Sequence, residues 1–175
     1  MQRLYDTTEA AKLFANAFLQ DPAFALCLAE ETDPKRAMNT FFSSYLENCK
    51  DLLLYTTNEP GKGYLCFYRW DKPPVEEFDC PECLSRLEEF QILDHHYQQN
   101  FAVLDTMAVQ PAARGKGLAG EMIDFFVAYC RQEGLIPLTE IFGENHLSLY
   151  QRHGFEPKYR QTHRGITTYV LEYLL

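Results

Sequence analysis

An apolar strand, a glycine-rich turn and an amphipathic helix follow one another in the second half of the chain. The run NFAVLDTMAV (100–109) is apolar or β-favouring apart from Asp105, as expected for the central strand of a buried sheet. PAARGKGLAG (111–120) comes next, and apolar residues then recur at helical spacing as far as Gly134, a predicted C-terminal cap. Because the N–H groups at the start of a helix lack intrahelical partners, the turn is predicted to hold an anion.

The glycines of this turn form a literal G-x-G-x-x-G at Gly115, Gly117 and Gly120, the pattern of dinucleotide-binding oxidoreductases. Glu140 even lies near the distance expected for a ribose contact. Two observations disfavour this alternative. QPAAR separates the strand from the first glycine, and only 35 residues follow Glu140, too few to complete a doubly wound sheet. A Walker phosphate loop is also disfavoured, because Lys116 is followed by glycine rather than by Ser or Thr.

The remaining pattern is Arg114-x-x-Gly117-x-Ala119. A pyrophosphate can lie across the N–H groups of a helix start, at the positive end of the helix dipole. We expect Gly115, Gly117 and the small Ala119 to let the anion reach the backbone, while Arg114 and Lys116 add positive charge.

The rest of the chain alternates helices and strands, which predicts a mixed α/β sheet in a single domain, residues 1–175. Expected helices run from an Asp6–Glu9 capping box to about Asp21-Pro22, from Asp33-Pro34 to Cys49, from Pro81 through Phe90, and over 145–153. Expected strands besides 100–109 are 52–57, 63–69, 135–142, 155–161 and 165–174, with the first two and the last two forming hairpins.

Composition narrows the class of protein further. With 46% hydrophobic and 23% charged residues, the chain should form a compact globule. Its formal charge of −9 opposes the counterion release on which nucleic-acid binding depends, so no nucleic-acid partner is expected. Neither a signal peptide nor a membrane-spanning run is visible, which predicts a cytoplasmic protein without membrane contacts. The six scattered cysteines are interpreted as reduced thiols.

Two other constellations carry little chemistry. Cys80-Pro-Glu-Cys83 is a single C-x-x-C with no second pair to complete a zinc site, so no metal is expected. Ser148 stands near His146 and His153, but no nucleophile elbow surrounds it.

Two separate motifs resemble one known family. LDTMAVQPAARGKGLAGEMI (104–123) resembles the strand, loop and helix of the GCN5-related N-acetyltransferase (GNAT) family, including its Val-x-Pro-x-x-Arg-Gly-x-Gly run. ENHLSLYQRHGFEP (144–157) resembles its second hallmark, an Asn and then a Tyr four residues before a Gly-Phe pair. ANAFLQDPAF (15–24) and the segment 137–155 further resemble the branch that contains puromycin N-acetyltransferase.

The resemblance implies a mostly antiparallel sheet of about seven strands flanked by helices, in which the central strand and the next one splay apart. Acetyl-CoA would lie in the gap as co-substrate. Backbone groups of Met107, Ala108 and Val109 would pair with its pantetheine arm. The pyrophosphate would lie on Arg114, Gly115, Lys116, Gly117, Leu118 and Ala119.

The resemblance also implies that Tyr150 protonates the departing CoA thiolate, and a phenol with an ordinary pKa near 10 is available for that role. The alternative is a packing residue on a short helix. Asn145 is expected to bond CoA, or only to cap this helix.

A general base is harder to identify from the sequence. By period-two alternation Asp105 shares a face with Met107 and Val109, and a carboxylate in so apolar a strand suggests that it binds or deprotonates the amine. A carboxylate bonded only to backbone or water is the equal alternative, and Glu140 and Glu144 are weaker candidates for the base.

The function predicted from these residues is direct transfer of an acetyl group from acetyl-CoA to an amine of a small molecule or a peptide. The alternative from another class is a catalytically inactive CoA-binding sensor or interaction module. The resemblance leaves a homodimer open, since dimers are frequent in this family.

Overall fold

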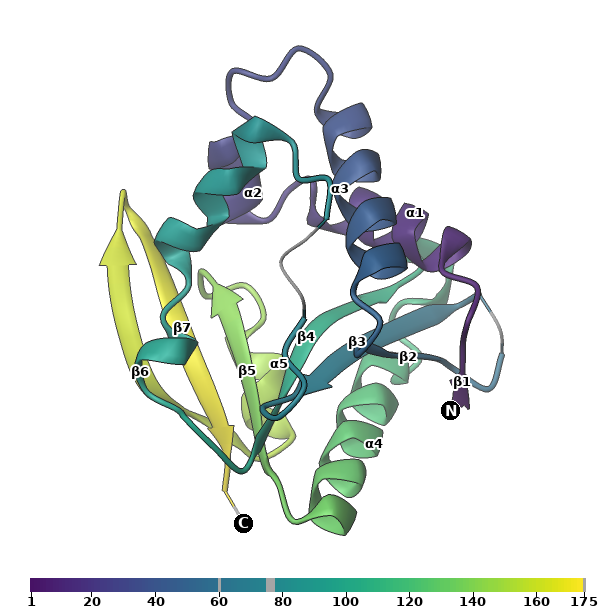
Figure 1. Ribbon diagram of the computed structural model, residues 1–175. Coiled ribbons are helices and arrows are strands. Elements are labelled where there is room, and N and C mark those ends of the chain that lie inside the picture. Colours follow the sequence, from purple (N-terminus) through teal and green to yellow (C-terminus); the bar gives the residue numbers. More distant parts are fainter. Residues whose placement is uncertain (60, 75–77, 175) are drawn as a thin grey trace.

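The computed structural model describes residues 1–59, 61–74 and 78–174 (Figure 1). Pro60, in the predicted first hairpin turn, lies outside the described residues. Helical elements are α1 (Thr8–Phe18), α2 (Pro22–Cys27), α3 (Pro34–Asn48), α4 (Leu118–Glu133), α5 (Leu147–Arg152) and the 3-10 segments η1 (Glu82–Phe90), η2 (Leu93–His95) and η3 (Pro111–Ala113). Strands are β1 (Gln2–Arg3), β2 (Leu53–Thr56), β3 (Gly63–Arg69), β4 (Phe101–Val109), β5 (Ile136–Phe142), β6 (Phe155–His163) and β7 (Ile166–Tyr173).

One seven-stranded sheet in the order β1-β2-β3-β4-β5-β7-β6 forms the centre of the molecule. Neighbouring strands are antiparallel except for β4 and β5, which run parallel and are connected by α4. This confirms the predicted fold class. The strand at 100–109 is the middle strand of the sheet, which explains its apolar composition.

The two parallel strands pair only over their first halves. Their register runs from Phe101 opposite Ile136 to Leu104 opposite Thr139, and both strands continue beyond these residues without pairing to each other. The sheet therefore splits at its centre, as the family resemblance implied. The main-chain edge of β4 beyond Leu104 has no β5 partner.

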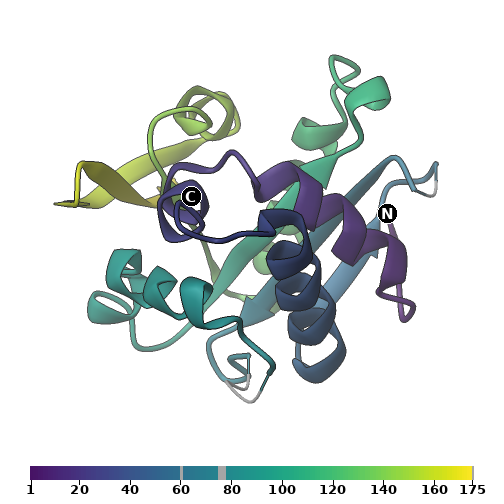
Figure 2. The ribbon, with the colours of Figure 1, turned by 90° about the horizontal axis from the view of Figure 1, so that it is seen from above.

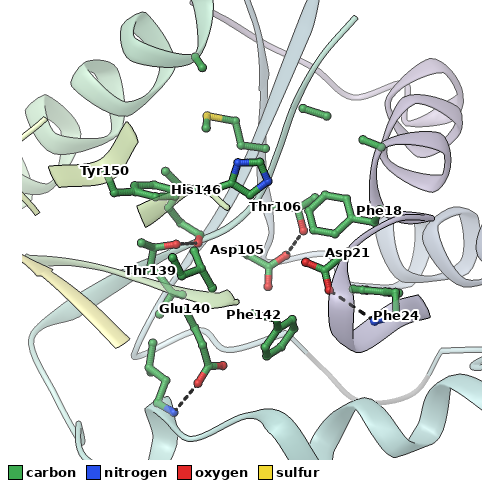
Figure 3. Close-up of a pocket in the computed structure, with 18 of the residues that line it drawn as sticks. Phe18, Asp21, Phe24, Asp105, Thr106, Thr139, Glu140, Phe142, His146 and Tyr150 are labelled. Atoms are coloured by element: carbon green, nitrogen blue, oxygen red, sulfur yellow. Dashed lines mark hydrogen bonds between the residues drawn. The ribbon is translucent and has the colours of Figure 1, made fainter. Parts of the chain in front are cut away.

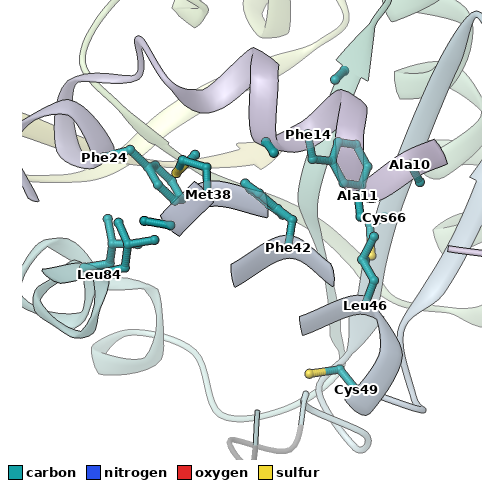
Figure 4. Packing of buried hydrophobic residues seen from close by; sticks show 14 of the residues in the cluster. Ala10, Ala11, Phe14, Phe24, Met38, Phe42, Leu46, Cys49, Cys66 and Leu84 are labelled. Atoms are coloured by element: carbon teal, nitrogen blue, oxygen red, sulfur yellow. The ribbon is translucent and has the colours of Figure 1, made fainter. Parts of the chain in front are cut away.

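Helices cover both faces of the sheet (Figures 1 and 2). On one face α1, α2, α3 and η1 share a core cluster with β2, β3 and the end of β4. Figure 4 shows the centre of this cluster, where Phe14 of α1, Phe24 of α2 and Phe42 of α3 come together. On the opposite face α4 and α5 pack on the sheet through a second cluster that includes Met122, Phe126 and Tyr150. The site described below lies where the split sheet joins the two faces.

The first half of the chain differs from expectation at three places. The capping box does not form, since α1 begins at Thr8 and the Asp6 carboxylate accepts hydrogen bonds from the N–H and the side chain of Thr8. The first helix, α1, ends at Phe18, and Asp21-Pro22 instead marks the start of a further helix. Asp21 caps the additional helix α2, accepting the N–H groups of Ala23 and Phe24, while Pro22 occupies its first position. The helix expected from Pro81 is a 3-10 segment.

A β-bulge in the central strand overturns the predicted direction of Asp105. Cys66 pairs with Thr106, and Phe67 pairs with Leu104, so Asp105 is the extra residue on β4. As a result Asp105 and Thr106 both face the α1–α3 side, while Met107 and Val109 pack against the α4 side. Period-two alternation fails here because a bulge shifts the side-chain phase by one residue.

Within the described part of the chain, no helix combines the length and apolar character needed to span a bilayer.

Candidate active site

A cavity of about 1800 Å³ runs through the split in the sheet. Its wall begins at the glycine turn before α4, continues along the unpaired ends of β4 and β5, and ends among α1, α2, α3 and the 3-10 segments on the opposite face. Figure 3 shows the part of this cavity where Tyr150, Asp105 and Asp21 lie. One continuous space therefore connects the predicted anion site with Tyr150 and Asp105.

Gly115 and Gly117 adopt the left-handed backbone, with φ of 77° and 82°. A Cβ at either position would meet no protein atom within 4 Å. Their requirement for glycine is thus conformational, because an L-residue is strained at such φ values. The two glycines turn the chain so that it enters α4 with its N–H groups directed outward.

Six consecutive N–H groups, from residue 115 to residue 120, have no acceptor among the described residues. The next N–H group along the chain, that of Glu121, donates to the Gly117 carbonyl. Gly115, Gly117, Leu118 and Ala119 line the cavity. A row of unsatisfied donors at the positive end of a helix of 16 residues fits the pyrophosphate of CoA.

Gly120 has a different role from the other two glycines. A Cβ there would lie 2.6 Å from Cε1 of His153, whose Nδ1 is 2.8 Å from an Asp124 carboxylate oxygen. The third glycine of the G-x-G-x-x-G pattern therefore makes room for a side chain of the same molecule. This explains the pattern without a dinucleotide.

The cavity gathers almost the whole predicted set of cofactor residues. Those that line it are Met107, Ala108, Val109, Arg114, Gly115, Gly117, Leu118, Ala119 and Asn145. Lys116 does not line it. The Arg114 side chain bends back to donate to the Val109 carbonyl at 3.3 Å. Asn145 makes no capping bond to α5, whose first residue is preceded by His146.

Tyr150 lies at the point where β4 and β5 separate. It is 6% exposed, lines the cavity and has its hydroxyl beside the hydroxyl of Thr139. Thr139 in turn donates to the Leu104 carbonyl at 2.9 Å. Burial raises the pKa of Tyr150 to about 12, so its hydroxyl stays protonated at neutral pH. This geometry suits a proton donor, and the packing alternative stays open because the Tyr150 ring also contacts Phe155, with ring centroids 5.7 Å apart.

Asp105 lies on the opposite wall, at the first position of β4 beyond its pairing with β5. Its carboxylate accepts the Thr106 hydroxyl at 2.7 Å. Burial raises the pKa of Asp105, and the hydroxyls of Thr106 and Tyr45 oppose that rise. A carboxylate with an elevated pKa in a cleft is suited to take up a proton.

Two further carboxylates line the same part of the cavity. Burial raises the pKa of Glu140 to about 7 and that of Asp21 to about 6. Sequence reasoning ranked Glu140 low and missed Asp21. The signal for Asp21 was present in the Asp-Pro pair, which is typical of a helix start, but nothing in the sequence placed that helix beside β4. Figure 3 shows Asp21 opposite Asp105, with Phe18, Phe24 and Phe142 around them.

Two other candidate side chains, Glu144 and His146, lie on the segment between β5 and α5. His146 lines the cavity, and burial together with the charge of Arg114 lowers its pKa, which favours the neutral imidazole. Glu144, a weak candidate for the base, is exposed and accepts the Tyr169 hydroxyl at 2.9 Å, outside the cavity lining.

Across residues 1–59, 61–74 and 78–174, no group of three or more His, Cys, Asp or Glu side chains is arranged to hold a metal ion. The six cysteines form no disulfide with one another.

Solved structures of several acetyltransferases share this fold. An acetyltransferase from Corynebacterium glutamicum, described as histone acetyltransferase HPA2 and related acetyltransferase, has a TM-score of 0.67 at 16% identity, covering 98% of this chain and 94% of that one. An N-acetyltransferase from Staphylococcus aureus has a TM-score of 0.64 at 16% identity, with 95% and 94% covered. A GCN5-related N-acetyltransferase from Rhodopseudomonas palustris has a TM-score of 0.55 at 14% identity, with 99% and 94% covered.

In sequence, residues 87–157 match the family described as acetyltransferase (GNAT) domain. That segment contains β4, the glycine turn, α4, β5 and Tyr150. The sequence match covers less than half of the chain, and the solved structures show a shared fold. Neither finding separates the branch of puromycin N-acetyltransferase from the rest of that family. No curated protein matches the chain in sequence.

Proposed function

We propose that this protein transfers an acetyl group from acetyl-CoA directly to an amine. The observation that carries the proposal is the row of N–H groups at 115–120, which have no acceptor among the described residues and open into the same cavity as Tyr150 and Asp105. An anion-binding turn alone would suit many ligands. Its continuity with a split sheet, whose β4 edge is unpaired beyond Leu104, suits a long ligand with a phosphate at one end and an extended arm.

The residues of the chain would divide the work as follows. Residues 114–119 would hold the pyrophosphate, and the free edge at 107–109 would pair with the pantetheine arm. The thioester supplies the acetyl group: the acceptor nitrogen bonds to its carbonyl carbon, the carbon–sulfur bond breaks, and the thiolate leaves. Tyr150 would give its hydroxyl proton to that sulfur, and Asp105 would take up the proton that the amine loses.

Binding and turnover test the proposal separately. We expect acetyl-CoA to raise the melting temperature and NAD to leave it unchanged, since a ligand at about 100 times its Kd stabilises the native state by roughly 2.7 kcal/mol. We then expect release of free CoA thiol when amines are added. Stabilisation by NAD but not by acetyl-CoA would overturn the proposal. CoA binding without thiol release over a broad amine panel would instead favour the inactive sensor or interaction module.

A further inference from the structure

Among the described residues, arginines line only one end of the cavity. Arg114 and Arg152 come from the glycine turn and α5, at the end proposed to hold the pyrophosphate, where Glu121 and Asp124 of α4 also line it. Asp21, Asp105 and Glu140 lie at the other end, on the face covered by α1–α3. No lysine is among the described residues that line the cavity. These three carboxylates therefore have no basic side chain beside them to balance their charge.

In two of these carboxylates, Glu140 and Asp21, one oxygen accepts backbone hydrogen bonds and the other accepts none from the described residues. Oε1 of Glu140 accepts the N–H groups of Ile92 and Leu93 at 2.7 and 3.0 Å. Oδ1 of Asp21 accepts those of Ala23 and Phe24 at 3.0 and 3.4 Å. The second oxygen of each group receives no hydrogen bond from the described residues. Each side chain is thus oriented by the backbone and keeps a free acceptor for another donor.

Burial raises the pKa of all three groups, because no neighbouring cation offsets their desolvation. The charges of Asp94 and Asp105 further raise the pKa of Glu140. A positive charge brought into this space would relieve both effects.

The walls between these carboxylates are aromatic. They include Phe18, Phe24, Phe41, Tyr45, Phe142 and Tyr68. Ring faces attract ammonium groups, and their apolar surface covers methylene chains well. A sugar-like acceptor has many hydroxyl groups whose hydrogen bonds must be satisfied, whereas a linear alkyl chain needs only apolar contact between its charged ends.

Resting on the function proposed above, we propose that the acceptor is a linear aliphatic diamine or polyamine. Its reacting nitrogen lies at Asp105, and its distal ammonium groups bind the free oxygens of Glu140 and Asp21. Acetylation follows the balance already given: one nitrogen–carbon bond forms, the thioester carbon–sulfur bond breaks, and one proton passes from the amine to the chain. The distal ammonium groups stay charged and unmodified.

The test compares amines that differ only in the number of charges. Butylamine, 1,4-diaminobutane and a linear triamine are each given to the full-length protein with acetyl-CoA, and free thiol is followed over time. We expect kcat/KM for the diamine and the triamine to exceed that for butylamine at least roughly tenfold. Equal use of butylamine, or a preference for a lysine-containing peptide, overturns the proposal while the acetyltransferase function stands.

Charge-neutral variants of the two backbone-held carboxylates locate the effect. Glu140→Gln and Asp21→Asn keep the carbonyl oxygen that accepts the backbone N–H groups, so the fold is retained. We expect KM for the diamine to rise at least roughly tenfold in each, and the ratio of kcat/KM for the diamine to that for butylamine to fall by a similar factor. Glu47→Gln, on the exposed side of α3, removes the same charge away from the cavity and serves as the control. A diamine preference that survives both cavity variants contradicts the proposal.

Binding keeps the two proposals separable. If no amine releases thiol, the proposed acetyl transfer fails, and the charge inference is then judged from the thermal shift produced by the diamine alone. Stabilisation of the unmodified protein but not of Glu140→Gln supports a diamine site. Equal shifts in both, or no shift in either, overturns it.

Discussion

The Thr139 hydroxyl donates to the Leu104 carbonyl oxygen at 2.9 Å, on the last pair of residues that joins β4 to β5. Beyond this pair the strands separate, and the Tyr150 hydroxyl lies beside the same threonine. The Thr139 side chain thus links the two strands where their pairing ends, and it also contacts Tyr150, the proposed proton donor.

Thr139→Val tests both parts of this arrangement. The variant leaves the buried Leu104 carbonyl without its donor, so we expect a loss of about 1–3 kcal/mol in the free energy of unfolding. Turnover should fall as well, because Tyr150 loses a neighbour that orients its hydroxyl. Thr168→Val is the matched control, since Thr168 is also buried and donates to the Phe90 carbonyl at 2.8 Å. Chemical denaturation and thiol release measure the two effects. Equal turnover in both variants would remove Thr139 from the site.

Tyr150→Phe removes the proposed acid and little else. We expect kcat to fall by roughly 10²-fold or more, with acetyl-CoA affinity nearly unchanged, because the phenyl ring keeps its packing in the α4-side cluster. Tyr169→Phe, which removes a hydroxyl bonded to Glu144 outside the cavity, is the control. Wild-type turnover in Tyr150→Phe would show that another group protonates the thiolate.

The glycine turn allows a comparison at equal backbone strain. Gly117 and Gly134 have φ of 82° and 68°, and a Cβ at either would meet no atom within 4 Å. Alanine at each position should therefore cost a similar 1 kcal/mol or so of stability. Only Gly117→Ala should weaken acetyl-CoA binding, by at least roughly tenfold, because only it redirects the N–H groups of the turn. Isothermal titration calorimetry measures the affinity of both variants for acetyl-CoA. Equal affinities would show that the pyrophosphate binds elsewhere.

The glycine turn could be predicted from the sequence because local pattern determines it, whereas the splay of β4 and β5 was expected only from the family resemblance. A buried strand, two left-handed glycines and an amphipathic helix specify the turn without reference to the rest of the chain. The acceptor end could not be read in this way. Asp105 was assigned to the wrong face because its direction depends on a bulge in the β3–β4 pairing, and such a pairing is non-local. Asp21 was missed because its helix start is local but its place beside Asp105 is not.

Glu140 predicts a particular pH dependence of stability. Its pKa is raised from an ordinary 4.5 to about 7 by burial, against the backbone N–H groups of Ile92 and Leu93, with Asp94 and Asp105 adding to the rise. Between these values the folded state holds a proton that the unfolded state has lost, so this group's contribution to stability falls as pH rises. Above about pH 7 the full cost is present.

In Glu140→Gln this cost is absent. We therefore expect the variant to gain stability relative to the unmodified protein as pH rises from about 5 to about 8, with the difference levelling off above the folded pKa. Denaturant unfolding across this range measures it. Glu47→Gln should show no such divergence. If the curves of Glu140→Gln and the unmodified protein run parallel, the carboxyl group does not carry the elevated pKa.

Variants at Gly120 and His153 test whether the third glycine of the G-x-G-x-x-G pattern is needed for packing or for ligand binding. A Cβ at residue 120 would lie 2.6 Å from the imidazole, which is itself paired with Asp124. Gly120→Ala must displace that ring or the first turn of α4, so we expect a loss of about 1–3 kcal/mol in the free energy of unfolding. His153→Ala in the same chain removes the obstacle and should restore most of that loss, which a double-mutant cycle measures. Additive losses would contradict the steric explanation. A restored fold that binds acetyl-CoA normally would separate the third glycine from the anion site, because its role would then be to accommodate a histidine and not a phosphate.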